Sequence, residues 1–288
     1  MQHGIKVIGV VGAGTMGSGI AQVGAQSGHE VILYDISDEI IQGAISRIAG
    51  FVRRAAEKGR LDPEAAEAAL TRLHPATDLA AMADAHVVIE AAPEILELKH
   101  QVFERLDAVC PPETILATNT STLSVTRIAA ATTRAEKVVG MHFFNPPPLM
   151  PLVEVAASSQ TAEATVAATV ALAEAMGKVP VRTKDVPGFI VNRVARPFYL
   201  EGLRLLGEGV ADHATIDRLI REGGNFPMGP FELMDLIGID INFAASQSVY
   251  EAFFGEPRFR PHPLQRRQVE SGNLGRKTGR GWYEYEDH

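Results

Sequence analysis

The chain has 288 residues, of which 46% are hydrophobic and 22% charged, and its formal net charge is −8. This length favours two domains, the negative charge gives no reason to expect a nucleic-acid partner, and no apolar run reaches the roughly 20 residues that span a bilayer. The single cysteine, Cys110, argues against a disulfide framework and a cysteine-based metal site, and residues 1–4 do not resemble a targeting segment. We therefore expect a cytoplasmic protein that holds no metal and acts on neither nucleic acid nor membrane.

A buried parallel strand is predicted over residues 5–11, and a glycine-rich segment follows it directly. The segment matches the G-x-G-x-x-G pattern and consists of Gly12, Ala13, Gly14, Thr15, Met16 and Gly17. A helix is predicted next, over residues 18–26, and this strand–turn–helix context separates a dinucleotide site from a plain glycine turn. Gly12 would allow the tight turn, Gly14 would let a pyrophosphate approach the backbone, and Gly17 would let helix and strand pack closely.

Asp35 closes a second predicted strand, residues 30–34, about 20 residues beyond the glycines. An acidic residue at this place hydrogen-bonds the ribose hydroxyls of NAD and repels the additional phosphate of NADP. No arginine follows immediately to bind such a phosphate. The predicted cofactor is therefore NAD.

Two helices are predicted after Asp35, over residues 40–59 and 64–70, with Pro63 in the first turn of the second. A dinucleotide-binding domain does not need this helical pair. Its basic side, which includes Lys58, is suited to a phosphorylated tail; an ordinary solvated charged face is an equally good interpretation of the charge pattern.

Further strands are predicted over residues 86–91 and 114–118, with a helix between them. The second strand ends in Asn119, Thr120, Ser121 and Thr122. Small polar residues at the carboxyl end of a strand face the crevice where open α/β sheets bind ligands. The alternative is that Ser121 or Thr122 caps the short helix that follows.

Two apolar runs, residues 137–140 and 152–155, flank a proline-rich loop and are predicted to be strands. His142 would leave the first strand at its carboxyl end, and Glu154 would lie inside the second, close enough to pair with it. A carboxylate beside an imidazole orients the ring and favours its protonated form, which suits a general base. A purely structural ion pair is the competing interpretation.

The spacing of apolar residues changes near residue 186, beyond a predicted helix at 162–176 and a predicted strand at 179–182. Apolar spacings of three and four dominate from residue 189 to residue 254, which predicts helices, and Pro197 predicts a kink or break in the first of them.

The last strand-like run is residues 281–283. Wide apolar faces over residues 231–236 and 243–254 predict a homodimer. The expected fold is α/β: a Rossmann-like NAD-binding domain with an inserted helical pair, residues 1–185, followed by an all-α C-terminal domain for substrate binding and dimerisation, residues 186–288.

Five short blocks are highly specific in combination: ATNTS at 117–121, GMHFFNP at 140–146, LVEV at 152–155, PGFIVNR at 187–193 and FPMGPFE at 226–232. On these blocks, and nearly end to end, the chain resembles the L-3-hydroxyacyl-CoA dehydrogenases, the NAD-dependent enzymes of fatty-acyl oxidation. Pro151 departs from the family pattern, because relatives commonly carry a lysine before LVEV.

The resemblance implies that His142 is the catalytic base, that Glu154 is its partner, and that Ser121 and Asn192 hydrogen-bond the reacting oxygen and the thioester. Lys58 would meet the CoA tail. Besides the glycine turn, the expected NAD contacts come from Asp35, Glu94, Lys99, Asn119, Ser121, Asn145 and Lys277.

The implied reaction oxidises an L-3-hydroxyacyl-CoA such as 3-hydroxybutyryl-CoA to the 3-ketoacyl-CoA, in fatty-acid β-oxidation or a related CoA-thioester pathway. A 3-hydroxyadipyl-CoA substrate is an alternative, and its distal carboxylate would need an arginine such as Arg196, Arg258 or Arg260. The chain could also be an NAD-binding relative with a structural or sensor role and no turnover, or a dehydrogenase of free hydroxy acids or sugar acids.

Overall fold

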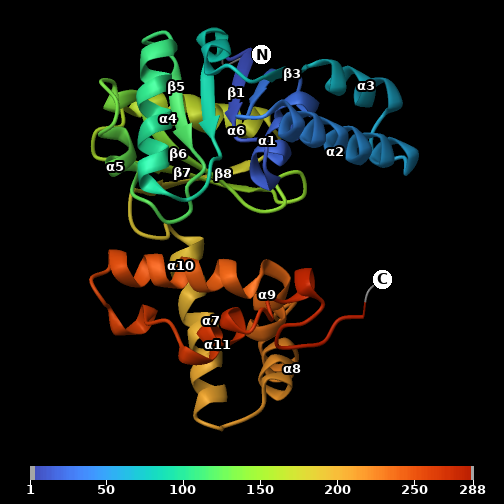
Figure 1. The fold of residues 1–288 in the computed structure, drawn as a ribbon, viewed down its shortest axis with the longest axis vertical. Coiled ribbons are helices and arrows are strands. Elements are labelled where there is room, and N and C mark those ends of the chain that lie inside the picture. Colours follow the sequence, from blue (N-terminus) through green and yellow to red (C-terminus); the bar gives the residue numbers. More distant parts are fainter. Residues whose placement is uncertain (1–3, 287–288) are drawn as a thin grey trace. The chain divides into compact units, whose positions relative to one another are not determined.

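The computed structural model describes residues 4–286, which divide into a compact unit ending at Val186 and a second unit starting at Pro187 (Figure 1). We call them the sheet unit and the helical unit. Residues 1–3, part of the N-terminal segment considered above, and residues 287–288 lie outside the described residues. Across residues 4–286, none of the helices is both long enough and apolar enough to cross a membrane.

The sheet unit is built on one eight-stranded sheet within the described residues, in the order β3-β2-β1-β4-β5-β6-β7-β8. Neighbouring strands are parallel except β6 and β7, which are antiparallel. The order of the strands reverses at β1 and β4, the kind of switch point where such sheets bind ligands. The strands are β1 (Val7–Val11), β2 (Glu30–Tyr34), β3 (Leu73–Ala76), β4 (Val87–Glu90), β5 (Ile115–Thr118), β6 (Val138–Phe143), β7 (Leu152–Ala157) and β8 (Val179–Lys184).

Helices cover both faces of the sheet, which is why the central strands are apolar on both sides. Ile20 of α1 and Leu172 of α6 belong to the same buried cluster as Val10 of β1. Helix α4 lies in front of the sheet in Figure 1 and α6 lies behind it. The helices of this unit are α1 (Thr15–Gln26), α2 (Asp38–Glu57), α3 (Pro63–Thr71), α4 (Leu96–Val109), α5 (Val125–Ala129) and α6 (Glu163–Ala175), with 3-10 turns η1 (Leu79–Asp84) and η2 (Ala135–Lys137).

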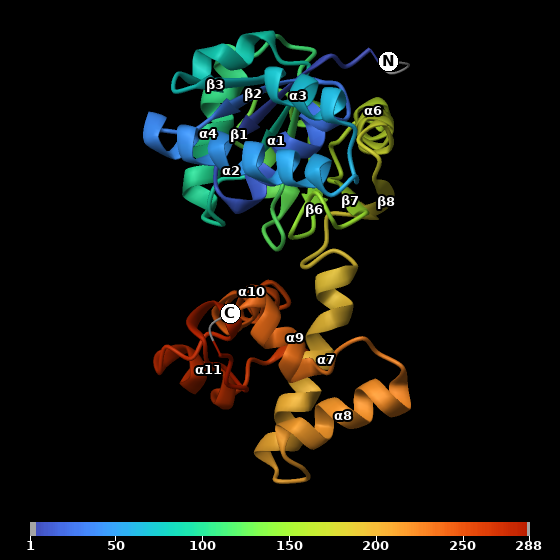
Figure 2. The same cartoon turned by 90° about the vertical axis from the view of Figure 1, so that its right-hand side faces the viewer.

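The inserted helices α2 and α3 lie side by side next to α1 (Figures 1 and 2). Asp62 caps α3 by accepting the N–H groups of Glu64 and Ala65, and Pro63 occupies the first turn. A bidentate pair between Arg53 and Glu67 joins the two helices on their exposed side.

The helical unit buries Leu203, Ile216, Phe231, Met234 and Ile239 in a shared core. Its helices are α7 (Val191–Gly207), α8 (His213–Gly224), α9 (Pro230–Ile237), α10 (Ile239–Ala252) and α11 (Pro263–Glu270), with 3-10 turns η3 (Pro257–Phe259) and η4 (Arg276–Thr278).

The C-terminal segment is held to the helical unit by the buried carboxylate of Asp235. This carboxylate accepts the backbone N–H groups of Trp282 and Tyr283 and the hydroxyl of Tyr285, each at 3.0 Å. Burial raises the pKa of Asp235 above its ordinary value, although these hydrogen bonds act in the opposite direction.

The predicted α/β class, with its inserted helical pair and helical second part, is confirmed, and the local structure differs from expectation in three places. The break expected at Pro197 is absent: helix α7 runs through this proline although one backbone hydrogen bond is lost there, because buried side chains such as Tyr199 and Leu200 hold the helix. Residues 281–283 form no strand in the described part of the tail, where Arg280 makes only isolated bridges. Strand β3 was not predicted, because its four residues include a proline and show no alternation.

Candidate active site

His142 and Glu154 lie directly opposite each other where β6 and β7 pair. Opposite residues of an antiparallel pair share one face of the sheet, and Nδ1 of His142 is 2.8 Å from Oε2 of Glu154. The two residues are only 4% and 1% exposed. An ionised carboxylate only accepts hydrogen bonds, so Nδ1 carries the hydrogen and Nε2 is the ring atom suited to accept a proton. The predicted contact between the two side chains is therefore present.

The strand that carries His142 is tied to the end of β5 by Asn119. The side-chain oxygen of Asn119 accepts the backbone N–H of Phe143 at 2.8 Å, and its own backbone N–H donates to the carbonyl of Glu90 at 2.8 Å. Asn119 thus links the carboxyl ends of β4, β5 and β6, which keeps His142 at a fixed place on this edge.

Glu94 organises the turn that contains Ser121. Its Oε1 accepts the Thr120 hydroxyl at 2.6 Å and the backbone N–H groups of Ser121 and Thr122 at 2.8 and 2.9 Å. Burial opposes the ionisation of Glu94, but the nearby positive charge of Lys99 and these hydrogen bonds outweigh it, so its pKa is lowered.

The alternative role of Ser121 or Thr122 as a helix cap is wrong. Ser124 caps α5 instead, because its hydroxyl accepts the N–H of Arg127 at 3.3 Å.

The glycine turn fits the pyrophosphate of a dinucleotide. A Cβ on Gly17 would lie 1.7 Å from the carbonyl oxygen of Gly12, so only glycine allows this approach of helix and turn. A Cβ on Gly14 would meet nothing within 4 Å, and no side chain caps the first turn of α1. The backbone N–H groups of that turn are consequently suited to bind an anion.

Asp35 is held at the end of β2 by two backbone donors. Its Oδ2 accepts the N–H of Ala13 at 2.7 Å and its Oδ1 accepts the N–H of Ile36 at 2.8 Å. Each carboxylate oxygen has a second lone pair for a ribose hydroxyl. Together with the glycine turn, this arrangement fits NAD.

Lys99, for which the family resemblance implies a cofactor contact, is almost fully buried, and this contact stays a prediction. Its Nζ lies 2.7 Å from Oε1 of Glu90 and 3.5 Å from Oε2 of Glu94, and the residue is 1% exposed. Sequence reasoning missed Glu90; the available signal was a carboxylate at the end of a strand that is otherwise Val and Ile.

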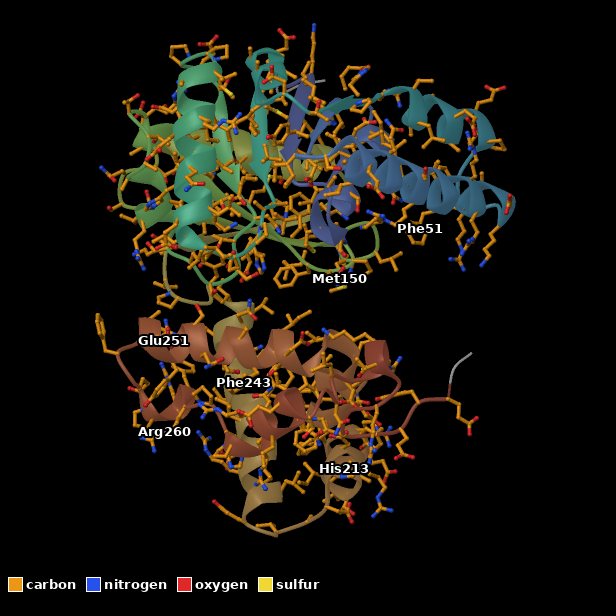
Figure 3. All side chains as sticks on the ribbon, viewed as in Figure 1. Phe51, Met150, His213, Phe243, Glu251 and Arg260 are labelled. Atoms are coloured by element: carbon orange, nitrogen blue, oxygen red, sulfur yellow. The ribbon has the colours of Figure 1, made fainter. Side chains whose placement is uncertain are left out.

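A cavity of about 630 Å³ lies between the first helices of the sheet unit and the proline-rich loop. Phe51, which is 59% exposed and labelled in Figure 3, lies on its wall beside Lys58. The wall also includes Arg47, Arg54, Arg60, Pro146, Pro147, Pro148 and Leu149. The cavity therefore combines an apolar surface with basic side chains.

The proline-rich loop is held by Lys178, a residue that the sequence did not single out. Its Nζ donates to the carbonyl oxygens of Pro147 and Met150 at 2.6 and 3.0 Å. Burial lowers the pKa of Lys178. Asn145 is exposed on the same loop.

Two predicted site residues belong to the helical unit. Asn192 is the second residue of α7, and Lys277 pairs through Nζ with both carboxylate oxygens of Asp240 at 2.6 and 2.7 Å. Their roles toward cofactor and substrate stay predictions.

The three arginines considered for a distal carboxylate differ in their surroundings. Arg196 is buried and donates to the carbonyl oxygen of Asn242 at 2.8 Å. Arg258 and Arg260 instead line a separate cavity of about 520 Å³ in the helical unit. Within residues 4–286, no group of three or more His, Cys, Asp or Glu side chains is arranged to hold a metal ion.

Comparison with known proteins gives two family matches. Residues 7–186 match the family described as "3-hydroxyacyl-CoA dehydrogenase, NAD binding domain", and residues 188–285 match "3-hydroxyacyl-CoA dehydrogenase, C-terminal domain".

The chain is 49% identical to the 3-hydroxyadipyl-CoA dehydrogenase of Escherichia coli over 99% of its own length, but it spans only 60% of that relative. It is 43% identical to the probable 3-hydroxybutyryl-CoA dehydrogenase of Bacillus subtilis, with 98% of both chains covered. The crystal structure of an (S)-3-hydroxybutyryl-CoA dehydrogenase from Ralstonia eutropha superimposes with a TM-score of 0.94 at 42% identity, covering 98% of this chain and 100% of that one.

Proposed function

The chain belongs to the 3-hydroxyacyl-CoA dehydrogenase family, and on that premise we propose that it oxidises an L-3-hydroxyacyl-CoA to the 3-ketoacyl-CoA with NAD as cofactor. The observation that carries the proposal is the buried His142–Glu154 pair at 2.8 Å. The pair lies in the sheet whose strand β1 leads into the glycine turn that fits a dinucleotide. Names of full-length relatives support the substrate class.

Oxidation of the 3-hydroxyl group removes a proton from oxygen and a hydride from carbon. NAD, when bound, supplies the acceptor for the hydride. His142 takes the hydroxyl proton on Nε2, and Glu154 stabilises the imidazolium that forms, because its carboxylate already holds Nδ1. A positioned general base of this kind accelerates a reaction by about 10²–10⁴-fold.

The cofactor would be held along the carboxyl edge of the sheet. The turn from Gly12 to Gly17 would bind the pyrophosphate, and Asp35 would bind the hydroxyls of the adenosine ribose. We assign the contacts with the other half of NAD to Glu94, Ser121, Asn119 and Asn145 of the sheet unit and to Lys277 of the helical unit.

The CoA tail of the substrate would use the cavity beside α2. Its basic wall, with Lys58, Arg54 and Arg47, is suited to phosphates, and the exposed ring of Phe51 offers a surface for a purine base. Ser121 and Asn192 are assigned to the thioester and the reacting oxygen.

The direct test is the consumption of NADH, followed by absorbance, when the protein is mixed with acetoacetyl-CoA. We expect turnover that depends on His142. A protein that binds NAD and acetoacetyl-CoA without turnover would instead be a non-catalytic relative. Equal turnover of the free acid and its CoA thioester would favour the dehydrogenases of free hydroxy acids.

A 3-hydroxyadipyl-CoA substrate is a second candidate, favoured by the 49% identity to the relative of that name. Comparison of kcat/KM for the hydroxybutyryl and hydroxyadipyl thioesters distinguishes the two. A preference for the dicarboxylic substrate would identify the chain as a 3-hydroxyadipyl-CoA dehydrogenase.

We further propose a cytoplasmic homodimer that forms through the helical unit and serves fatty-acid β-oxidation or a related pathway. Several large apolar side chains of this unit are 46–71% exposed, which supports a partner surface. They include Val194, Leu219, Phe226, Leu236 and Ile241. Light scattering during size-exclusion chromatography tests the dimer, and a monomer mass would contradict it.

A further inference from the structure

A closed ring of polar contacts lies at the carboxyl ends of β4 and β5. Thr118 donates its hydroxyl to Oε2 of Glu90 at 2.7 Å and accepts the N–H of Thr120 at 3.2 Å. Thr120 donates its hydroxyl to Oε1 of Glu94 at 2.6 Å. Lys99 closes the ring, because its Nζ lies 3.5 Å from Oε2 of Glu94 and 2.7 Å from Oε1 of Glu90.

The two acids of this ring lie in different surroundings. Glu90 and Thr118 are 0% exposed and Lys99 is 1% exposed, whereas the side chain of Glu94 is 36% exposed. A buried ammonium needs a carboxylate within hydrogen-bonding distance, and Glu90 provides it. Glu90 also accepts the N–H of Ala92 at 2.7 Å, so its carboxylate is fixed from three sides.

One carboxylate oxygen of Glu94, Oε2, therefore stays available to accept a hydrogen bond. Oε1 of Glu94 is occupied by donors from Thr120, Ser121 and Thr122. The contact of Oε2 with Lys99 is 3.5 Å, beyond the length of a strong charged hydrogen bond. Lys99 lies closer to Oε1 of Glu90, at 2.7 Å, and to the carbonyl oxygen of Ala92, at 3.2 Å, than to this oxygen.

We propose that Glu90 is a positioning residue for the nicotinamide half of NAD, an inference that rests on the proposed function. A dinucleotide at a switch point lies with its adenosine half over β2, where Asp35 is placed, and its other half over β4 and β5. Glu94 follows β4, so its Oε2 is the acceptor for a ribose hydroxyl of that other half. Glu90 holds Lys99 so that this oxygen does not become the partner of the lysine.

The proposal predicts a selective effect of Glu90→Gln, which keeps the shape of the side chain and removes its charge. Lys99 would move to Glu94 and occupy Oε2. Measured by isothermal titration calorimetry, NAD binding should weaken by about tenfold or more, while binding of ADP, which contains only the adenosine half, should stay within about twofold.

A double-mutant cycle separates this role from a structural one. If Glu90 acts through Glu94, then Glu90→Gln should change NAD affinity less than about twofold in protein that already carries Glu94→Gln. If Glu90 only supports the sheet, the two losses should add, and ADP binding should fall together with NAD binding.

Thr118→Val provides a second variant in case Glu90→Gln does not fold, as judged by circular dichroism. It removes one donor to Glu90 and keeps the size of the side chain, so a smaller loss of about threefold, again restricted to NAD, is expected. Equal losses for NAD and ADP, additive losses in the cycle, or unchanged NAD affinity in both variants would overturn the inference alone. Wild-type protein that does not bind NAD would overturn the proposed function as well.

Discussion

Ala13 donates its backbone N–H to Oδ2 of Asp35 at 2.7 Å, which joins the glycine turn at the start of α1 to the acid at the end of β2. The turn proposed for the pyrophosphate and the acid proposed for the ribose are therefore held in a fixed position relative to each other. The Asp35 carboxylate holds the turn, and in the proposed function it would also carry the charge that repels a 2′-phosphate.

Asp35→Asn should weaken NAD binding by about 1.5–3 kcal/mol, because hydrogen bonds to the charged carboxylate are lost. It should also narrow the preference for NAD over NADP, since the repulsive charge is removed. Calorimetric dissociation constants for both cofactors check this prediction. Asp38→Asn, at the exposed start of α2, is the matched control; an unchanged NAD to NADP ratio in Asp35→Asn would contradict the assigned role.

His142→Ala should lower kcat by about 10²–10⁴-fold and leave the dissociation constant of NAD unchanged, because we propose that the ring acts as a base and not as a cofactor ligand. Glu154→Gln should also lower kcat more than NAD affinity, because the neutral amide no longer stabilises the imidazolium. Steady-state kinetics and NAD titration measure the two quantities. Near-normal turnover in His142→Ala would exclude it as the base.

Gly17→Ala and Gly14→Ala form a matched pair at one turn. A Cβ at Gly17 would lie 1.7 Å from the carbonyl oxygen of Gly12, so this change should lower the free energy of unfolding by about 3 kcal/mol. A Cβ at Gly14 meets nothing in the protein, so stability should hold while NAD binding weakens. Chemical denaturation and calorimetry give both values, and equal stability of the two variants would contradict the geometry.

Lys58→Ala should raise KM for the acyl-CoA substrate about 3- to 10-fold with little change in KM for NAD, because we propose that this side chain meets the CoA phosphates and not NAD. Lys184→Ala is the control, since Lys184 is exposed at the end of β8 and does not line the cavity. Raising the salt concentration should shrink the effect. A parallel rise in KM for NAD would place Lys58 elsewhere.

The sheet unit should lose stability in acid, because the stabilising carboxylate of Asp107 becomes protonated there. Burial opposes its ionisation, but hydrogen bonds from Thr133 and Arg134 and the charge of Arg134 outweigh it and lower the pKa of Asp107 below its ordinary value. A carboxyl group whose pKa is lower in the folded than in the unfolded state stabilises the fold at pH values above its unfolded-state pKa. This stabilisation is lost as the pH falls through its folded-state pKa.

Asp107→Asn should therefore be less stable than wild type by about 1–3 kcal/mol at neutral pH, with the difference shrinking below about pH 4. Urea denaturation at both pH values measures it. Glu67→Gln, which removes the exposed partner of Arg53, should change nothing measurable. A difference for Asp107→Asn that grows in acid would contradict the sign.

Local sequence patterns predicted the turn from Gly12 to Gly17 and the contact between the side chains of His142 and Glu154. These features depend on strand alternation and on neighbours close in the chain, which single-sequence patterns record. The cluster of Glu90, Lys99 and Thr118 was not predicted, because three elements meet there only after the sheet forms. Lys178 was missed for the same reason, since its partners lie about 30 residues away on the loop.

The register in which β6 and β7 pair decides whether the side chains of His142 and Glu154 can meet. Side chains alternate between the faces of a strand, so a one-residue shift in the pairing of β6 with β7 would turn residue 154 to the opposite face. Such a change would separate the carboxylate from the imidazole without altering either amino acid.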